Sequence, residues 1–227
     1  MVSRALMASW AVLDVLLLAA GVVALALSIV WRAPNVLMNM VLSNADLTAG
    51  TILGVSLIVT FVISVTAIVQ RNHVIFPLEI LNWALLIDSI GIVVIGTFVW
   101  FYTLRQRANF YELWKVASRE DKIFLQDMFK CCGYFNGTDL AEIGGAFCTS
   151  VEVAAALGNE DKLETNYCVS HITGFADSTL NNIFTTVYGY MAIVICLFLA
   201  TLCVIKKRQE AERFKRIDAK RGGKGFV

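Results

Sequence analysis

The chain has 227 residues, of which 58% are hydrophobic and 16% are charged, and its mean hydropathy is +0.69. This balance is too apolar for a soluble domain, so we expect an integral membrane protein. The net charge of +1 hides an asymmetry: residues 105–182 include seven basic and eleven acidic side chains, whereas residues 206–227 include nine basic and three acidic ones. We therefore expect one acidic and one basic side of the membrane.

Four apolar runs are long enough to span a bilayer, which requires about 20 residues per helix. They cover residues 5–30, 50–69, 78–104 and 183–205. Residues 1–104 thus hold three spans, with a short extracellular loop at 32–49 and a short cytoplasmic loop at 70–77. A large extracellular loop (105–182), the fourth span (183–205) and a basic cytoplasmic tail (206–227) follow. The first run could instead be a cleaved signal peptide, but it is longer than the usual signal core and contains Asp14.

Positive charge indicates the orientation of these spans. Arg4, Arg71 and the basic cluster of the tail fall on one side, and this side is predicted to be cytoplasmic. Arg105 and Arg107 fall on the other side and are outnumbered. We expect both termini in the cytoplasm and the protein in the plasma membrane, with endosomal or vacuolar membranes as further locations.

Four of the six cysteines lie in the large loop, together with the sequon Asn136-Gly137-Thr138. Adjacent cysteines rarely bond to each other because the ring that they close is strained, so each is expected to find a distant partner. The even count and the sequon favour an extracellular lobe with two disulfides, although three pairings are possible. Reduced thiols in a cytosolic loop, or a zinc site, are the alternatives. The cysteines are Cys131, Cys132, Cys148 and Cys168.

Periodicity in the large loop predicts two helices before the cysteines. The first has an apolar stripe at i, i+3, i+4 and i+7. Ser118 is predicted to cap the second, with Asp121 three residues later. Gly133 is expected to end this helix in a left-handed conformation. A last helix is predicted to begin near 177–178 and to continue into the fourth span. The stripe of the first helix is Phe110, Leu113, Trp114 and Ala117.

This arrangement resembles the tetraspanin family over essentially the whole chain. Its marks are four spans, a short first and a large second outer loop, and Cys131-Cys132-Gly133 after two helices in that loop. The resemblance implies an all-α four-helix transmembrane bundle with a small, disulfide-stapled, mainly helical extracellular lobe. It also implies the pairs Cys131–Cys168 and Cys132–Cys148. The compact loop and basic tail are most similar to fungal tetraspanins, which are associated with host penetration and polarised growth.

The family's functions are carried over as expectations. A tetraspanin is a non-catalytic organiser that binds partner membrane proteins laterally through its large extracellular loop, here through the variable segment 134–167. It also packs with other copies of itself and can hold a sterol or another lipid between its spans. Cysteines at the inner membrane face are commonly palmitoylated in this family, and here only Cys203 lies near that face. We expect no other cofactor and no metal. The sequence also offers no pattern that is typical of an enzyme.

Four polar residues interrupt the spans, which invites a functional interpretation. A hydrogen bond between Asp14 and Asn82 would hold two spans in register. Asp88 lies near mid-membrane with no basic residue in any span, so we expect it to be protonated and hydrogen-bonded or to face a polar cavity. Glu79 is near enough to the cytoplasmic interface to reach water. The alternative function is a small channel or transporter that uses Asp14 and Asp88.

Small residues could bring the first two spans together. Gly50 and Gly54 in the second span match a stripe of small residues in the first, Gly21, Ala24 and Ser28. This pattern predicts a close helix contact, unless it reflects chance in spans rich in glycine and alanine.

The basic tail is expected to contact anionic lipids of the inner leaflet, at about 1 kcal/mol for each basic residue. A stop-transfer signal alone would explain the first three basic residues but not the others. Nucleic acid is not expected as a partner of a tail tethered to a membrane. The residues assigned to lipid contact are Lys206, Lys207, Arg208, Arg213, Lys215 and Arg216.

Overall fold

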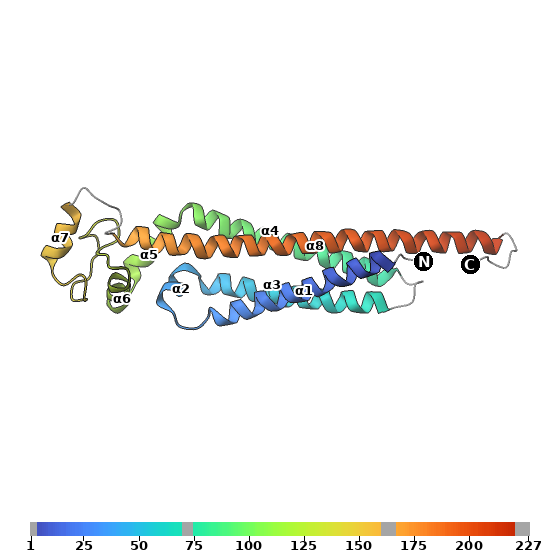
Figure 1. Cartoon of the computed structure of the whole chain (residues 1–227), viewed down its shortest axis with the longest axis horizontal. Helices are drawn as coiled ribbons and strands as arrows, with labels where there is room; N and C mark the ends of the chain where they lie inside the picture. The colour runs from blue at the N-terminus through green and yellow to red at the C-terminus, as the bar shows by residue number, and fades with distance from the viewer. Residues whose placement is uncertain (1–3, 70–74, 160–166, 221–227) are drawn as a thin grey trace. The chain divides into compact units, whose positions relative to one another are not determined.

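The computed structural model describes residues 4–69, 75–159 and 167–220, and all the regular elements in these ranges are helices (Figure 1). Four of them are long and apolar enough to cross a membrane. This confirms the expected all-α class with four candidate spans. The helices are α1 (Arg4–Val30), α2 (Val36–Val41), α3 (Asn44–Val69), α4 (Phe76–Leu104), α5 (Gln106–Val116), α6 (Arg119–Phe129), α7 (Val151–Asn159) and α8 (Cys168–Lys220), with α1, α3, α4 and α8 as the candidate spans.

The chain divides into two compact units, which are described separately. The bundle unit consists of Met1–Val30, Thr48–Gly96 and Thr186–Val227. The lobe unit consists of Trp31–Leu47 and Thr97–Thr185, so most of the connection 32–49 groups with the large loop.

In the bundle unit, α1 and α3 approach each other closely where both have glycine. A Cβ atom on Gly54 would lie 2.8 Å from the backbone nitrogen of Leu25, and one on Gly21 would lie 3.1 Å from the carbonyl oxygen of Gly54. A Cβ on Gly50 would likewise meet the Ser28 hydroxyl at 2.6 Å. The contact predicted from small residues is therefore confirmed, because a larger side chain at Gly21 or Gly54 would meet the backbone of the facing helix and push the two helices apart.

The core of the lobe unit is built around fully buried aromatic side chains. Phe110 and Trp114 of α5 and Tyr134 pack with Leu125 of α6. The short helix α2 was not predicted within the first loop. Asn35 caps its N-terminus, where the side chain accepts hydrogen bonds from the backbone N–H groups of residues 37 and 38. It adds Leu37, Met40 and Val41 to the same core.

The predicted cap of α6 is confirmed, but its predicted end is wrong. The Ser118 hydroxyl accepts a hydrogen bond from the backbone N–H of Asp121 at 3.1 Å. The helix ends at Phe129, where Lys130, with φ of 52°, takes the left-handed conformation that closes it, whereas the positive φ of Gly133 belongs to the turn that follows. The N–H of Cys131 then bonds to the carbonyl of Gln126 at 3.0 Å, which closes the helix before the cysteine pair.

The last helix starts about ten residues earlier than predicted. Helix α8 begins at Cys168, because the N–H groups of Cys168 and Val169 donate to the carbonyls of Gly133 and Tyr134 at 3.1 and 3.2 Å. These contacts satisfy donors that a helix start would otherwise leave free. Its first turns then pack into the lobe core through Val169, Ile172, Ala176 and Leu180.

Candidate functional site

The four cysteines of the large loop are buried and joined in two disulfides, Cys131–Cys168 and Cys132–Cys148. The first bond ties the end of α6 to the start of α8 within the main core. The second holds a small separate cluster with Ala154. The two adjacent cysteines thus form bonds in different parts of the lobe unit, one in the main core and one in the small cluster.

Gly133 makes the turn between these two bonds possible. It has φ of +66°, and a Cβ atom there would lie 1.9 Å from the carbonyl oxygen of Asn136. The next residue, Tyr134, enters the core, and its hydroxyl donates to the carbonyl of Arg107 at 2.9 Å. Burial raises the pKa of Tyr134, because the charged phenolate would be desolvated.

The sequon lies in the exposed loop just after this turn. Asn136 is exposed, and its Oδ1 accepts hydrogen bonds from the N–H and the hydroxyl of Thr138, both at 3.0 Å. The Asn136 side chain is therefore accessible from solvent.

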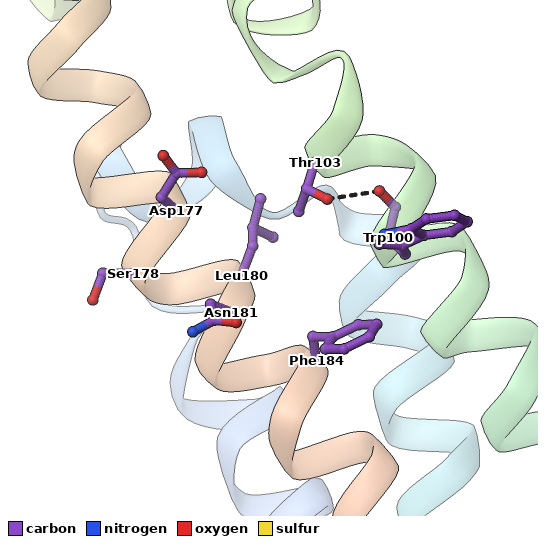
Figure 2. A pocket seen from close by; sticks show the side chains of 7 residues that line it. All are labelled: Trp100, Thr103, Asp177, Ser178, Leu180, Asn181 and Phe184. Atoms are coloured by element: carbon purple, nitrogen blue, oxygen red, sulfur yellow. Dashed lines mark hydrogen bonds between the residues drawn. The ribbon is translucent and has the colours of Figure 1, made fainter.

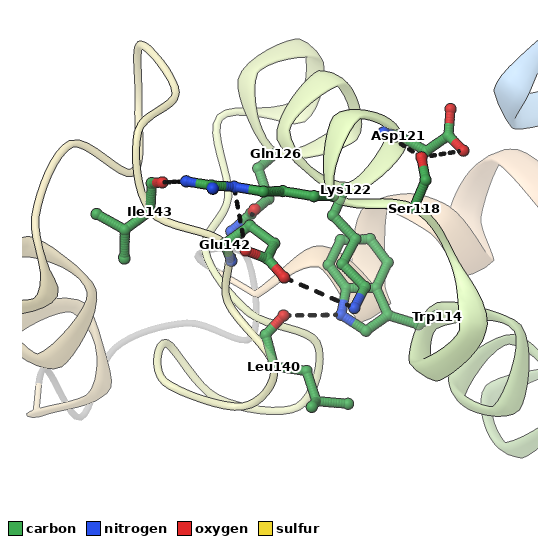
Figure 3. A network of polar contacts seen from close by, with 9 residues as sticks. Trp114, Ser118, Asp121, Lys122, Gln126, Leu140, Glu142 and Ile143 are labelled. Carbon is green, nitrogen blue, oxygen red and sulfur yellow. Dashed lines mark hydrogen bonds and ion pairs between the residues drawn. The ribbon is translucent and has the colours of Figure 1, made fainter.

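A polar network attaches residues 140–143 to α5 and α6 (Figure 3). Trp114 Nε1 donates to the carbonyl of Leu140 at 3.3 Å, and the N–H of Glu142 donates to Gln126 Oε1 at 3.2 Å. The Glu142 carboxylate lies 3.6 Å from Arg119 Nε and 4.0 Å from the buried Lys122 Nζ. These contacts hold an irregular loop in one conformation without a strand or a helix.

Helix α7 packs one side on the small cysteine cluster and exposes Val151, Glu152 and Val153 in its first turn. Ala154 is buried against Cys132 and Cys148, and Leu157 packs on the same cluster. Val151 is 66% exposed and Val153 is 38% exposed. The sequence analysis did not predict this helix. It lies within the segment 134–167 that was expected to bind partners, and part of that segment lies outside the described residues.

The polar residues of the spans differ in their hydrogen-bond partners. Both carboxylate oxygens of Asp88 accept hydrogen bonds from α3, one from Ser56 and one from Thr60 at 2.7 Å. The expected bond between Asp14 and Asn82 is wrong: Oδ1 of each lacks a hydrogen-bond partner among the described residues. Instead, Asp14 faces Ser64 of α3.

Residues missed by the sequence analysis explain these pairings. Ser56, Thr60 and Ser64 recur at every fourth position of α3 and thus form a line of hydroxyls along one side of the helix. Their spacing was visible in the sequence, but hydroxyls in a span often bond only to their own helix. Glu79 is exposed in the first turn of α4, where a negative charge is favourable.

The tail continues α8 as a helix through Lys220. Lys206, Lys207, Arg213, Lys215 and Arg216 are exposed, but Arg208 is only 5% exposed and therefore packs within the bundle unit. Cys203 is exposed and has a free thiol.

A pocket of about 620 Å³ lies between the end of α4 and the early turns of α8, inside the lobe unit (Figure 2). The sequence analysis did not predict it. Its lining includes the side chains of Trp100, Thr103, Asp177, Leu180, Asn181 and Phe184.

Searches against protein-family models, curated proteins and solved structures found no match to the chain.

Proposed function

We propose that this chain is a tetraspanin-type membrane organiser that binds partner membrane proteins laterally and carries out no catalysis itself. The observation that supports this most is the lobe unit with Cys131-Cys132-Gly133 at its centre, inserted between the third and fourth candidate spans and tied by two disulfides. Such a lobe offers a folded, disulfide-tied surface that can meet the extracellular parts of neighbouring proteins.

The recognition surface in this proposal is the first turn of α7, whose exposed side chains are Val151, Glu152 and Val153. The Cys132–Cys148 bond and buried Ala154 hold the helix in place, while Val151 and Val153 remain exposed. Exposed apolar side chains on a rigid support are typical of the centre of a protein interface.

The other parts of the proposal concern the membrane and the cell. The spans pack against partners and other copies of the chain, and a sterol or another lipid fills gaps between them. The large loop lies outside the cell with a glycan on Asn136, and both termini lie in the cytoplasm of a plasma-membrane protein. The resemblance to fungal tetraspanins suggests a role in polarised growth or host penetration, and Cys203 is available for palmitoylation.

The tail binds anionic inner-leaflet lipids through its first exposed basic residues, Lys206 and Lys207. Because α8 stays helical, Arg216 lies 11 residues beyond Ile205, which corresponds to about 16 Å along the axis. This exceeds the Debye length of about 8–10 Å. Arg213, Lys215 and Arg216 therefore reach the leaflet only if the helix bends or tilts, and otherwise they face cytoplasmic partners.

The lateral-binding proposal is tested by capture from living cells in mild detergent, followed by mass spectrometry. Charging the α7 surface with Val151→Glu and Val153→Glu should remove specific partners from the captured set. Val116→Glu is the matched control, because Val116 is 80% exposed and belongs to a different helix of the lobe unit, α5. All variants must form both disulfides. The same partners in all three captures would exclude α7 as the recognition surface.

Orientation is tested through the sequon. Asn136→Gln should increase gel mobility, and glycosidase treatment should give wild-type protein the mobility of the variant. A wild-type band that neither change shifts would count against glycosylation of the loop.

A channel or transporter is the second proposal, because buried polar groups remain without partners in the bundle unit. Asp14 is 4% exposed and Ser64 fully buried, and neither Asp14 Oδ1 nor Ser64 Oγ has a hydrogen-bond partner in the described chain. Ion and proton flux should be measured in reconstituted vesicles, with Asp14→Asn and Asp88→Asn as variants. If the wild type carries no flux, this alternative is excluded.

A further inference from the structure

Two buried polar side chains of the bundle unit face each other, and each has an oxygen atom without a partner. Asp14 of α1 is 4% exposed and Ser64 of α3 is fully buried. The Ser64 hydroxyl is close enough to act on the Asp14 carboxyl. Neither Asp14 Oδ1 nor Ser64 Oγ, however, has a hydrogen-bond partner among the described residues. Buried polar atoms without partners are uncommon, and a bound water or ion is one explanation for them.

The Ser64 hydroxyl differs from most other hydroxyls of this unit. Serine and threonine inside a helix commonly donate to a carbonyl three or four residues earlier in the same helix. Four hydroxyls of the bundle unit do so, at 2.7–2.8 Å: those of Ser28, Thr66, Ser89 and Thr201. Ser64 makes no such bond within the described chain. Its lone pairs are therefore available to a ligand that lies beside Asp14.

The protein does not balance the charge of Asp14. None of the ion pairs among the described residues includes it. A buried carboxylate without a partner is very unfavourable, so the group must either keep its proton or bind a cation. A protonated Asp14 would donate to the neighbouring Ser64 hydroxyl, and then Ser64 Oγ would have a partner. The two unpartnered oxygen atoms therefore favour a cation.

The second buried acid of the bundle unit has a different environment. Both carboxylate oxygens of Asp88 already accept hydrogen bonds, one from Ser56 and one from Thr60. Its acceptors are thus occupied by side chains of α3, and it offers no oxygen atom that lacks a partner. Of the two acids, only Asp14 has the free oxygen that a ligand requires.

We propose that Asp14 and Ser64 bind one monovalent metal cation, such as sodium, between α1 and α3. Carboxylate and hydroxyl oxygens suit hard cations, and water molecules commonly fill the remaining positions around such ions. One carboxylate neutralises one positive charge, whereas a divalent ion would leave a net charge inside the membrane. The two ligands lie fifty residues apart in the sequence, which is why the sequence analysis expected no metal.

The cation would strengthen a helix pair that is already in close contact. Gly21, seven residues after Asp14, lies against α3 near Gly54. A cation shared by α1 and α3 would therefore tie the same two helices about two turns further along. The proposal depends on neither the organiser function nor transport, because a bound cation can stay in place. It is tested by binding and stability, whereas those functions are tested by partner capture and flux.

The test uses the full chain in detergent at constant pH and constant chloride, with sodium, potassium or choline as the cation. We expect the Tm to be about 2–4 °C higher in sodium or potassium than in choline. This is the shift for a protein of this size when the metal concentration is about five times the dissociation constant. Binding of radioactive sodium to the same samples should saturate.

Two pairs of variants locate the cation. Asp14→Asn should abolish both the Tm shift and the binding of sodium, and Ser64→Ala should weaken the binding about tenfold, because one contact to a charged group is lost. Asp88→Asn is the matched control for the acid, since the oxygens of Asp88 have partners. Ser89→Ala is the control for the hydroxyl, which donates to the carbonyl of Leu85 at 2.8 Å. Both controls should keep the wild-type shift.

Three results would overturn the proposal. Equal Tm values in the three salts, with no bound sodium, would show that Asp14 keeps its proton instead. A metal-dependent shift that persists in Asp14→Asn would place the cation elsewhere. Loss of the shift in Asp88→Asn or Ser89→Ala as well would show a general response of the bundle rather than a site. The wild-type comparison decides the question even if a variant does not fold.

Discussion

At the scale of single residues, position 133 requires glycine both because of its backbone conformation and because there is no room for a side chain. Its positive φ is unfavourable for other residues, and the carbonyl of Asn136 occupies the place of a Cβ atom. We expect Gly133→Ala to lower the free energy of unfolding by at least about 2 kcal/mol. Thermal unfolding of the purified protein in detergent would measure this.

Gly174 is the matched control for this prediction. It lies inside α8, and a Cβ atom there would meet nothing within 4 Å. Gly174→Ala should leave stability unchanged or raise it by up to about 1 kcal/mol, because alanine favours the helix. Equal losses in the two variants would contradict the role assigned to the turn.

Tyr134 predicts how the stability of the lobe unit depends on pH. Because burial raises its pKa, the folded protein keeps the phenolic proton at pH values where the unfolded protein releases it. The contribution of Tyr134 to the free energy of unfolding is therefore fully present below pH 10, about the ordinary tyrosine pKa, and it is lost as the pH rises above that value. Unfolding should be measured from pH 8 to 11.

Tyr134→Phe separates this effect from other alkaline effects. The variant should lose about 1 kcal/mol at neutral pH, because the hydrogen bond to the carbonyl of Arg107 is removed. Its stability should then fall less steeply above pH 10. Burial, followed by the charge of Asp139, also raises the pKa of Tyr111, so a smaller slope should remain. Parallel curves for the two proteins would rule out Tyr134 as the titrating group.

At the scale of elements, Asp88 holds α3 and α4 together through two hydroxyls rather than through a charge partner. We expect Asp88→Ala and Thr60→Val to be coupled by about 0.6–1.7 kcal/mol, the range for hydrogen bonds between helices in a membrane. A double-mutant cycle on unfolding in detergent gives this coupling.

Thr66→Val provides the control cycle with Asp88→Ala. Thr66 lies on the same helix, but it is exposed and its hydroxyl donates to the carbonyl of Ile63 in its own helix at 2.8 Å. Its effect should simply add to that of Asp88→Ala. A Thr60 coupling no larger than the Thr66 coupling would mean that the bond contributes nothing to stability.

The elements also show what can be predicted from sequence. Four spans follow from apolar runs, and the cap of α6 follows from Ser118 and Asp121, because both are local signals. The start of α8 was missed because carbonyls of Gly133 and Tyr134, more than thirty residues earlier, fix it. The partners of Asp88 were missed for the same reason: they depend on how two helices face each other.

At the scale of the whole molecule, the stability of the lobe unit depends on which segments its two disulfides join. The pairing was implied by family resemblance, since four cysteines alone permit three pairings. The pocket could not be predicted at all, because Trp100 and Asp177 come from separate helices that only the fold brings together. Local patterns thus predicted the four spans and the helices α5 and α6 but not α2 or α7, whereas the sites lie where distant segments meet.

The two disulfides should therefore contribute unequally. Cys131–Cys168 closes 37 residues and lies in the main core, whereas Cys132–Cys148 closes 16 residues and holds the small cluster beneath α7. Loop entropy alone makes the first bond worth about 0.7 kcal/mol more.

Replacing both cysteines of a pair by serine avoids a lone reactive thiol, so the two double variants are directly comparable. We expect the pair 131/168 to lose more thermal stability and surface delivery than the pair 132/148. Only the variant without the 132–148 disulfide should keep a folded core, which near-UV circular dichroism of the buried aromatic residues can detect. The reverse order would place the structural centre of the lobe unit beneath α7 rather than at the junction of α6 and α8.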